Sequence, residues 1–100
     1  MKQRQDYAGS TGMHPANPFH PGEVLLEEFL TPGGTSQAAF ARKIGWTTTR
    51  LNEFIKGKRG VTADAALDLA ECLGTSPRLW MNLQTTYDLA AAMRRRRDVA

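Results

Sequence analysis

Two short segments with helical spacing of their apolar residues flank Gly45, in the middle of the chain. The apolar residues recur at three- and four-residue intervals, which places them on one face of a helix. Glycine adopts the left-handed backbone conformation at a helix end without steric cost, so Gly45 suits a tight turn between two helices. The residues that define the two apolar faces are Phe40 and Ile44 before the turn and Leu51, Phe54 and Ile55 after it.

The residues around this turn predict how the two helices begin and pack. Ser36 and Thr47 stand where the helices would start, and both are capping side chains. Ala41 offers the second helix only a methyl group, so the two axes can approach closely at a steep angle. This arrangement is a helix-turn-helix. It would expose polar side chains that suit base edges in a major groove, namely Gln37 on the first helix and Thr48, Thr49, Asn52, Glu53 and Lys56 on the second.

A basic turn follows the second helix and contains Lys56, Lys58 and Arg59. Such a turn lies where a loop would meet the phosphate backbone of DNA. A helical hairpin with a glycine turn is common in all-α proteins and does not by itself indicate DNA binding. The outer face of the second helix, however, lacks the dense Glu/Lys pairing of a merely solvated helix. The two features together favour a DNA-binding protein.

The flanking segments predict three more helices. Pro21 begins the first, which covers the back of the helix-turn-helix and ends at the run from Thr31 to Gly34, while its three glutamates point outward. Thr62 caps a mostly buried helix that Gly74 closes. Its apolar stripe consists of Ala63, Ala66, Leu67, Ala70 and Leu73, widened by Leu69 and Cys72.

Ser76 and Pro77 begin the last helix, which carries a stripe of large apolar residues. Two aromatic residues are more than a small core usually accommodates, so part of the stripe is predicted to form a protein–protein surface. The alternative is simple core packing against Phe29 and Leu67. The stripe consists of Leu79, Trp80, Leu83, Tyr87 and Ala90.

Length and composition limit the class of protein. One hundred residues with 41% hydrophobic content suit one small globular domain, and the net charge of +3 points mildly to an anionic partner. Cys72 is the only cysteine, so an intramolecular disulfide is excluded and a reducing cytoplasm is expected. The chain contains no membrane-spanning run, and His14 and His20 are expected to be exposed or capping rather than metal ligands. We expect no enzymatic activity, metal or cofactor, because no catalytic or phosphate-binding motif is present.

The sequence divides into three parts. Residues 1–19 are rich in Gln, Gly, Ser, Asn and Pro and predict a flexible arm. Residues 20–93 carry the helical pattern, and residues 94–100 form a basic tail. The four arginines of this tail repel one another and are expected to be solvated, with an anion-binding tail as the alternative.

Several of these segments together resemble the HigA family of antitoxins. The matching sequence segments are HPGEVLLEEFL at 20–30, SQ at 36–37, RLNEFIKGKRG at 50–60, VTAD at 61–64, WMNLQ at 80–84 and YDL at 87–89. The resemblance implies an all-α, five-helix, lambda-repressor-like domain of the XRE class. It also implies a dimer that represses its own operon and neutralises HigB, a RelE-like toxin that cleaves mRNA.

The resemblance, taken with the residue chemistry, selects a DNA-contacting set. Gln37 and Lys58 are expected on phosphates, Arg50 on a phosphate or a base, and Glu53 either accepts a hydrogen bond from cytosine or discourages wrong sequences. The operator sequence cannot be transferred from relatives, because they often carry Ser or Arg where this chain has three threonines. The full set is Gln37, Thr47, Thr48, Thr49, Arg50, Asn52, Glu53, Lys56, Lys58 and Arg59.

A single helix-turn-helix reads too few base pairs to select one genomic site, so a two-fold dimer on an inverted repeat is expected. Its half-sites should be centred roughly 34 Å apart. The predicted dimer contacts are Leu79, Leu83 and Tyr87, with Trp80 either in the interface or in the core. Two other functions remain open: a solitary XRE-type repressor without a toxin, and a protein-binding adaptor.

Overall fold

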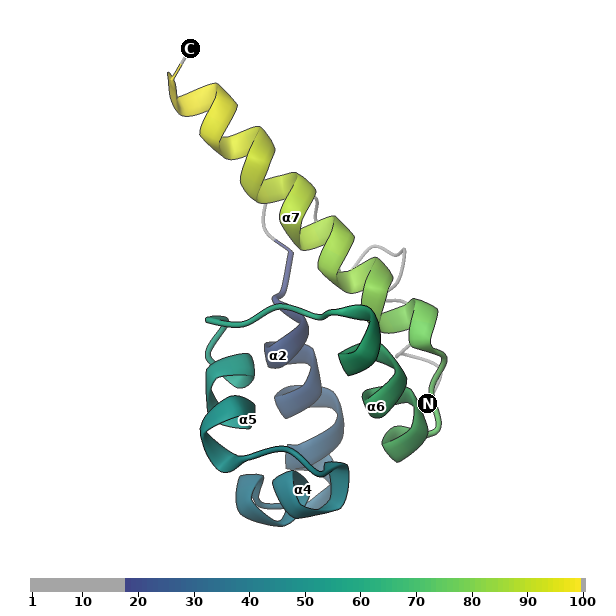
Figure 1. The fold of residues 1–100 in the computed structure, drawn as a ribbon. Helices are drawn as coiled ribbons and strands as arrows, with labels where there is room; N and C mark the ends of the chain where they lie inside the picture. Colours follow the sequence, from purple (N-terminus) through teal and green to yellow (C-terminus); the bar gives the residue numbers. More distant parts are fainter. Residues whose placement is uncertain (1–17, 100) are drawn as a thin grey trace.

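Helices make up most of residues 18–99, the part of the chain that the computed structural model describes (Figure 1). No strand occurs in this part, and the helical segments form five helices, the first of which combines α2, η1 and α3. The prediction of an all-α, five-helix domain is confirmed. The predicted arm, apart from its last two residues, lies outside the described residues. The bounds are α2 Pro21–Leu25, η1 Leu26–Leu30, α3 Thr31–Gly33, α4 Gln37–Ile44, α5 Thr48–Ile55, α6 Ala63–Leu73 and α7 Pro77–Val99.

Hydroxyl caps begin the last four helices, as the sequence predicts. Each cap oxygen accepts a hydrogen bond from the backbone N–H three residues later, at 3.0–3.1 Å, and so satisfies an N–H that has no partner within the helix. Gly45 ends α4 and Gly74 ends α6, with φ angles of 82° and 71°. The four caps are Ser36, Thr47, Thr62 and Ser76.

The first helix runs further than the sequence predicts, through Thr31 and Pro32 to Gly33, and its middle turn is a π-helix. Within this turn the N–H of Thr31 bonds to the carbonyl of Leu26, five residues back instead of four. Proline has no N–H and its ring clashes with the carbonyl of the preceding turn. A widened turn is one way a helix accommodates such a residue, and here Gly34 ends the helix in the left-handed conformation.

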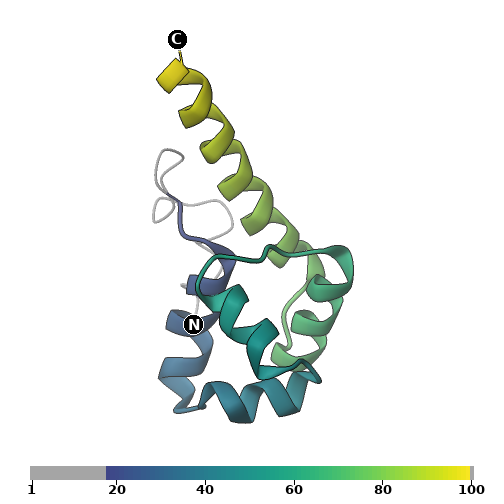
Figure 2. The same cartoon turned by 60° about the vertical axis from the view of Figure 1, so that its left-hand side comes forward.

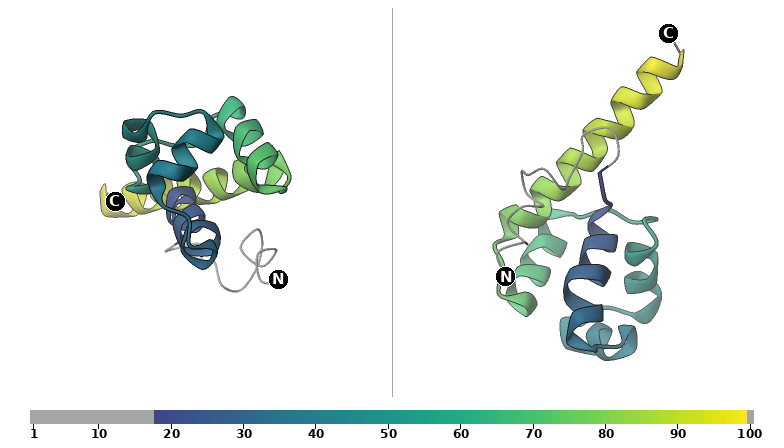
Figure 3. Two further views of the ribbon diagram at one scale, coloured as in Figure 1. Left: turned by 90° about the horizontal axis from the view of Figure 1, so that it is seen from below. Right: turned by 180° about the vertical axis from the view of Figure 1, so that it is seen from behind.

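The core is built from residues of all five helices. In Figures 1 and 3, α2 stands between α5 on one side and the α6–α7 pair on the other, and Figure 2 shows α4 closing the lower end. Leu25, Leu51 and Leu69 have no exposed surface. Gly22 allows the closest approach, because an added Cβ would lie 1.8 Å from the carbonyl oxygen of Phe54. The first helix is therefore held directly against the last turn of α5.

The predictions for Ala63, Leu67 and Leu83 need correction, whereas the alternative left open for Trp80 is decided in favour of the core. Leu67 is 56% exposed and Ala63 is exposed as well, so neither belongs to the core stripe of α6. The buried face of this helix consists of Ala65, Ala66, Leu69 and Ala70. Trp80 and Leu83 are 0% and 1% exposed within one protomer, so neither presents surface for dimer contacts. The Trp80 indole packs on Phe29, as the core alternative requires, and donates a hydrogen bond to Thr75 Oγ1 at 2.8 Å.

The boundary expected at residue 93 is not a helix end. Helix α7 continues through Arg94–Arg97, all four of which are exposed, and its distal half projects beyond the other helices (Figures 1 and 2, and Figure 3, right). Leu89 and Met93 on this half are each 58% exposed. The arginines are therefore presented on the exposed distal half of a helix.

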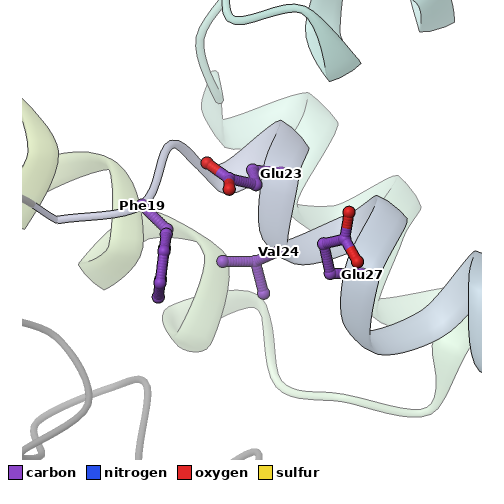
Figure 4. Close-up of a pocket in the computed structure, with 4 residues that line it drawn as sticks. All are labelled: Phe19, Glu23, Val24 and Glu27. Carbon is purple, nitrogen blue, oxygen red and sulfur yellow. The ribbon is translucent and has the colours of Figure 1, made fainter.

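Residues before α2 also pack on the domain. Phe19 lies beside α2 and lines a small pocket of about 30 Å³ with Glu23, Val24 and Glu27 (Figure 4). A pocket of this size holds about one water molecule and no larger ligand. Residues 18–99 contain no group of three His, Cys, Asp or Glu side chains arranged to hold a metal, and no helix long and apolar enough to cross a bilayer.

Candidate DNA-binding site

Helix α5 has a buried inner face and a polar outer face. Leu51 and Phe54 are at most 1% exposed, and Ala41 of α4 packs at 2% exposure, as expected for closely packed helices. Thr48 and Thr49, at the start of the helix, are fully on the exposed side. The predicted base-reading end of α5 is thus open to a ligand.

Two predicted DNA-contacting residues from different helices touch each other. The amide of Asn52 donates a hydrogen bond from Nδ2 to Oε1 of Gln37, at 3.4 Å, and both side chains are half-buried. Gln37 is the first residue of α4, so the contact joins the two helices across the turn. It limits the rotamers of both amides and leaves the Oδ1 atom of Asn52 and the Nε2 atom of Gln37 for other partners.

The basic turn after α5 is also anchored to that helix. The guanidinium of Arg59 contacts Glu53 Oε1 at 2.7 Å, and the N–H of Lys58 donates to the Glu53 carbonyl at 2.8 Å. Gly57 enables the turn with a φ angle of 80°. The Arg59–Glu53 pair is half-exposed and contributes little stability, but it offsets one negative charge on the outer face. Lys56 and Lys58 remain exposed.

Sequence reasoning assigned no role to Trp46, which organises the start of α5. Its side chain is 7% exposed, and its indole N–H donates to Asp68 Oδ2 on α6 at 3.0 Å. The guanidinium carbon of Arg50 lies 3.9 Å from the centre of the Trp46 ring. The sequence does contain a signal for this contact, because a tryptophan and an arginine stand four residues apart at a helix start.

His20 is the N-cap of α2. Its Nδ1 accepts the N–H of Gly22 at 2.9 Å, and its ring packs edge-on against Phe54 and Tyr87. The side chain is only 8% exposed, which confirms the capping alternative and not the exposed one. Burial lowers the pKa of His20 below its ordinary value, and the charge of Asp88 partly opposes this change. The neutral imidazole is therefore the form that the fold favours.

Cys72 packs against the core from a half-buried position on α6, as predicted. Burial raises the pKa of the Cys72 thiol, and the charge of Lys43 partly opposes the change. The protonated thiol lies 3.7 Å from the Lys43 carbonyl oxygen. Because a nucleophilic cysteine needs a lowered pKa, Cys72 acts as a packing residue.

The structure buries two of the four predicted dimer residues and leaves the other two partly exposed. Leu79 and Tyr87 are half-buried and retain some surface, unlike Trp80 and Leu83. An open, largely apolar groove of about 510 Å³ lies between α6 and α7. Its lining includes Ala63, Leu67, Pro77 and Met81, and the Met81 side chain is 36% exposed.

Comparison with known families and proteins gives consistent matches. A helix-turn-helix family model matches residues 26–80. Virulence-associated protein I from Dichelobacter nodosus is 45% identical over 74 residues, which cover 74% of this chain and 68% of that protein. Antitoxin HigA-1 from Vibrio cholerae is 40% identical over 73 residues, which cover 72% of this chain and 68% of the antitoxin.

Solved structures show the same similarity in three dimensions. Antitoxin GraA superimposes with a TM-score of 0.77 at 46% identity, covering 87% of this chain and 90% of GraA. Pseudomonas aeruginosa antitoxin HigA, solved with the higBA promoter, has a TM-score of 0.73 at 42% identity and covers 76% and 83% of the two chains. Among these matches are proteins named as antitoxins, and another relative, from Escherichia coli, is named as a helix-turn-helix transcriptional regulator.

Proposed function

The chain belongs to the helix-turn-helix family and, within it, to the HigA-type antitoxins, and on this premise we propose that it binds operator DNA and represses its own operon. The proposal rests on the polar and basic side chains that the outer face of α5 exposes. Exposed Thr48 and Thr49 stand beside Asn52, whose amide is oriented by Gln37, and exposed Lys58 follows at the end. A polar first turn suits base edges, and a basic last turn suits phosphates.

DNA binding by two copies is part of the same proposal. Two recognition helices related by a two-fold axis would read an inverted repeat whose half-sites lie roughly 34 Å apart. The α6–α7 groove is the favoured contact between copies, because Leu67 and Met81 expose apolar surface there while Trp80 and Leu83 do not. Leu79 and Tyr87, which the sequence also predicts as dimer contacts, are half-buried and remain candidates.

Neutralisation of a RelE-like toxin is the third part, and the family membership supports it. We assign this activity to a surface other than the outer face of α5, because that face carries the polar groups expected on DNA. A toxin bound elsewhere would leave the operator contacts available. Repression and neutralisation should then be separable by mutation.

The test uses the native operon in two assays. A chain with Thr48, Thr49 and Asn52 all replaced by Ala should lose repression of a promoter reporter and yet relieve the growth arrest caused by the adjacent gene. Circular dichroism of this variant should match the parent, since all three side chains lie on the outer face. Retained repression would contradict the DNA assignment, and failed rescue by the folded variant would place the toxin on α5.

A solitary repressor differs from an antitoxin in one measurable respect. If no toxic neighbour exists, the parent chain will repress its promoter but will copurify with no small partner when expressed with its native flanking DNA. An adaptor would fail the promoter assay altogether. The two assays thus separate the three functions that the sequence leaves open.

A further inference from the structure

Arg50 occupies a position in which its side chain is held before any ligand arrives. Its backbone N–H bonds to the capping oxygen of Thr47 at 3.0 Å, which fixes the residue in the first turn of α5. Its guanidinium carbon lies 3.9 Å from the centre of the Trp46 ring. The electron-rich face of a tryptophan ring attracts a guanidinium, and the attraction grows when the pair is desolvated.

The surface on which Arg50 rests is itself fixed. Trp46 is 7% exposed, packs edge-on against Phe54 at a centroid distance of 5.8 Å, and donates its indole N–H to Asp68. Asp68 belongs to α6, which is outside the helix-turn-helix. The orientation of the Trp46 ring is therefore set by two contacts, one with α5 and one with α6.

The hydrogen-bonding edge of the Arg50 guanidinium is not used by the protein. Within residues 18–99 no carboxylate or carbonyl accepts a hydrogen bond from this side chain, and nearby Glu53 is paired with Arg59 instead. The contact with Trp46 occupies a face of the guanidinium and leaves its in-plane N–H groups available. These groups form a fork that matches two adjacent acceptors.

We infer that Arg50 reads a guanine in the major groove of each half-site, and that Trp46 and Asp68 are positioning residues for it. The inference rests on the proposed DNA binding and deepens it by assigning one base. Guanine presents O6 and N7 side by side, and a bidentate arginine is the commonest specific contact to this pair. Thr48 and Thr49, the other side chains of the first turn, each offer one hydroxyl and cannot make such a contact.

The placement favours a base over a phosphate. Base edges are contacted from the first turn of a recognition helix, whereas phosphates are met by the flanking turns, where exposed Lys56 and Lys58 lie. A phosphate contact needs charge and little orientation. The Trp46–Asp68 support provides orientation and would be unnecessary for a phosphate contact.

The experiment measures operator affinity by fluorescence anisotropy at fixed salt, on the native operator and on a set with each base pair of the half-sites replaced. Arg50→Ala should weaken binding to the native operator by roughly 5- to 150-fold per half-site and abolish discrimination at one G·C pair. Arg50→Lys keeps the charge but loses the planar fork and the stacking on Trp46, so the salt dependence should stay as in the parent while the discrimination is reduced. Uniform losses across all operators would overturn the inference in favour of a phosphate contact.

Asp68 provides the test of positioning. Asp68→Asn keeps an oxygen that accepts the Trp46 N–H and should retain discrimination at the same G·C pair, whereas Asp68→Ala should reduce it several-fold. Both variants lose the same negative charge, so any effect of that charge on affinity is equal in the two. The difference between them therefore reports the hydrogen bond to Trp46 alone. Equal discrimination by the two folded variants would overturn the positioning role.

These measurements separate failure of the Arg50 inference from failure of the proposed DNA binding. If the parent chain binds no operator, the DNA assignment itself is wrong. If the parent discriminates among operators and Arg50→Ala does so equally well at every position, only the inference about Arg50 falls. Thermal unfolding of each variant verifies that the affinities compare folded proteins.

Discussion

The outer face of the α4–α5 pair and the groove face of the α6–α7 pair rest on the same core but expose different chemistry. On the first face the long polar side chains already touch the protein, as in the pairs Asn52–Gln37 and Arg59–Glu53. On the second, the exposed groups are apolar and include Leu67 and Met81. Ordering polar side chains before binding lowers the entropic cost of association. Burial of apolar surface is favourable in free energy and depends little on the exact geometry of the contact.

This difference leads to opposite responses to salt. Contacts of α5 and its basic turn with DNA should weaken steeply as salt concentration rises, because phosphate binding releases counterions. Association through Leu67 and Met81 should be almost insensitive to moderate salt. The two faces can therefore be perturbed one at a time.

The largest expected effect is the loss of stability when a charged side chain is placed in the core, next to the groove face. Leu83→Glu places a carboxylate at a position that is 1% exposed and should destabilise the fold by about 4 kcal/mol or more. Thermal unfolding followed by circular dichroism measures this loss. A variant that remains folded as stably as the parent would show that Leu83 can reach the surface.

The next effect concerns the groove face alone. Leu67→Glu should leave the fold intact and give a monomer by sedimentation, since the side chain is 56% exposed. Loss of the second recognition helix should then weaken operator binding on the order of 100-fold. Leu89→Glu is the matched control, because Leu89 is 58% exposed but lies outside the groove. Dissociation caused by the control instead would move the dimer contact to the distal half of α7.

A smaller effect separates two residues of the recognition face. Lys58→Ala should weaken binding to all sequences and lower the slope of log affinity against log salt by about one per half-site. Asn52→Ala should mainly reduce discrimination among operators, by roughly 1–3 kcal/mol at the base it contacts. Anisotropy titrations at three salt concentrations distinguish the two. Identical behaviour of the variants would contradict the division between base and phosphate contacts.

The smallest effect is the pH dependence that His20 contributes to folding. Because the folded protein lowers the pKa of His20, the unfolded chain binds more protons as pH falls through the ordinary histidine pKa of about 6.5. The free energy of unfolding should therefore be highest above this range and decrease below it. His20→Asn retains a capping acceptor that does not titrate, so urea unfolding between pH 7.5 and 5.5 should show a weaker decrease. An equal decrease in both proteins would assign the effect to other groups.

The boundaries of α4, α5 and α6 were predictable because local chemistry sets them, whereas the ends of the first helix and of α7 were not. The hydroxyls of Ser36, Thr47 and Thr62 accept the expected N–H groups, and Gly45 and Gly74 adopt the expected left-handed conformation. Each of these interactions involves residues at most four apart. Such contacts can be inferred from spacing alone.

Burial was less predictable because periodicity identifies a face and not its depth. Leu67 shares a helical stripe with buried Ala66 and Ala70, yet no neighbouring helix covers its side chain. The Trp46–Asp68 hydrogen bond joins residues 22 positions apart, which no local pattern encodes. The DNA contacts themselves remain predictions, although the structure brings Asn52 against Gln37 and Arg59 against Glu53.

The absence of a side chain at Gly22 has a consequence for how this scaffold can change its target. The first helix meets the last turn of α5 through main-chain atoms, since the carbonyl oxygen of Phe54 and the Cα of Ile55 occupy the space that a Cβ would need. Main-chain atoms are the same whichever residues stand on the outer face. The angle of the recognition helix is therefore decoupled from its reading residues, and new operator preferences can arise by exchange of outward side chains without redesign of the support.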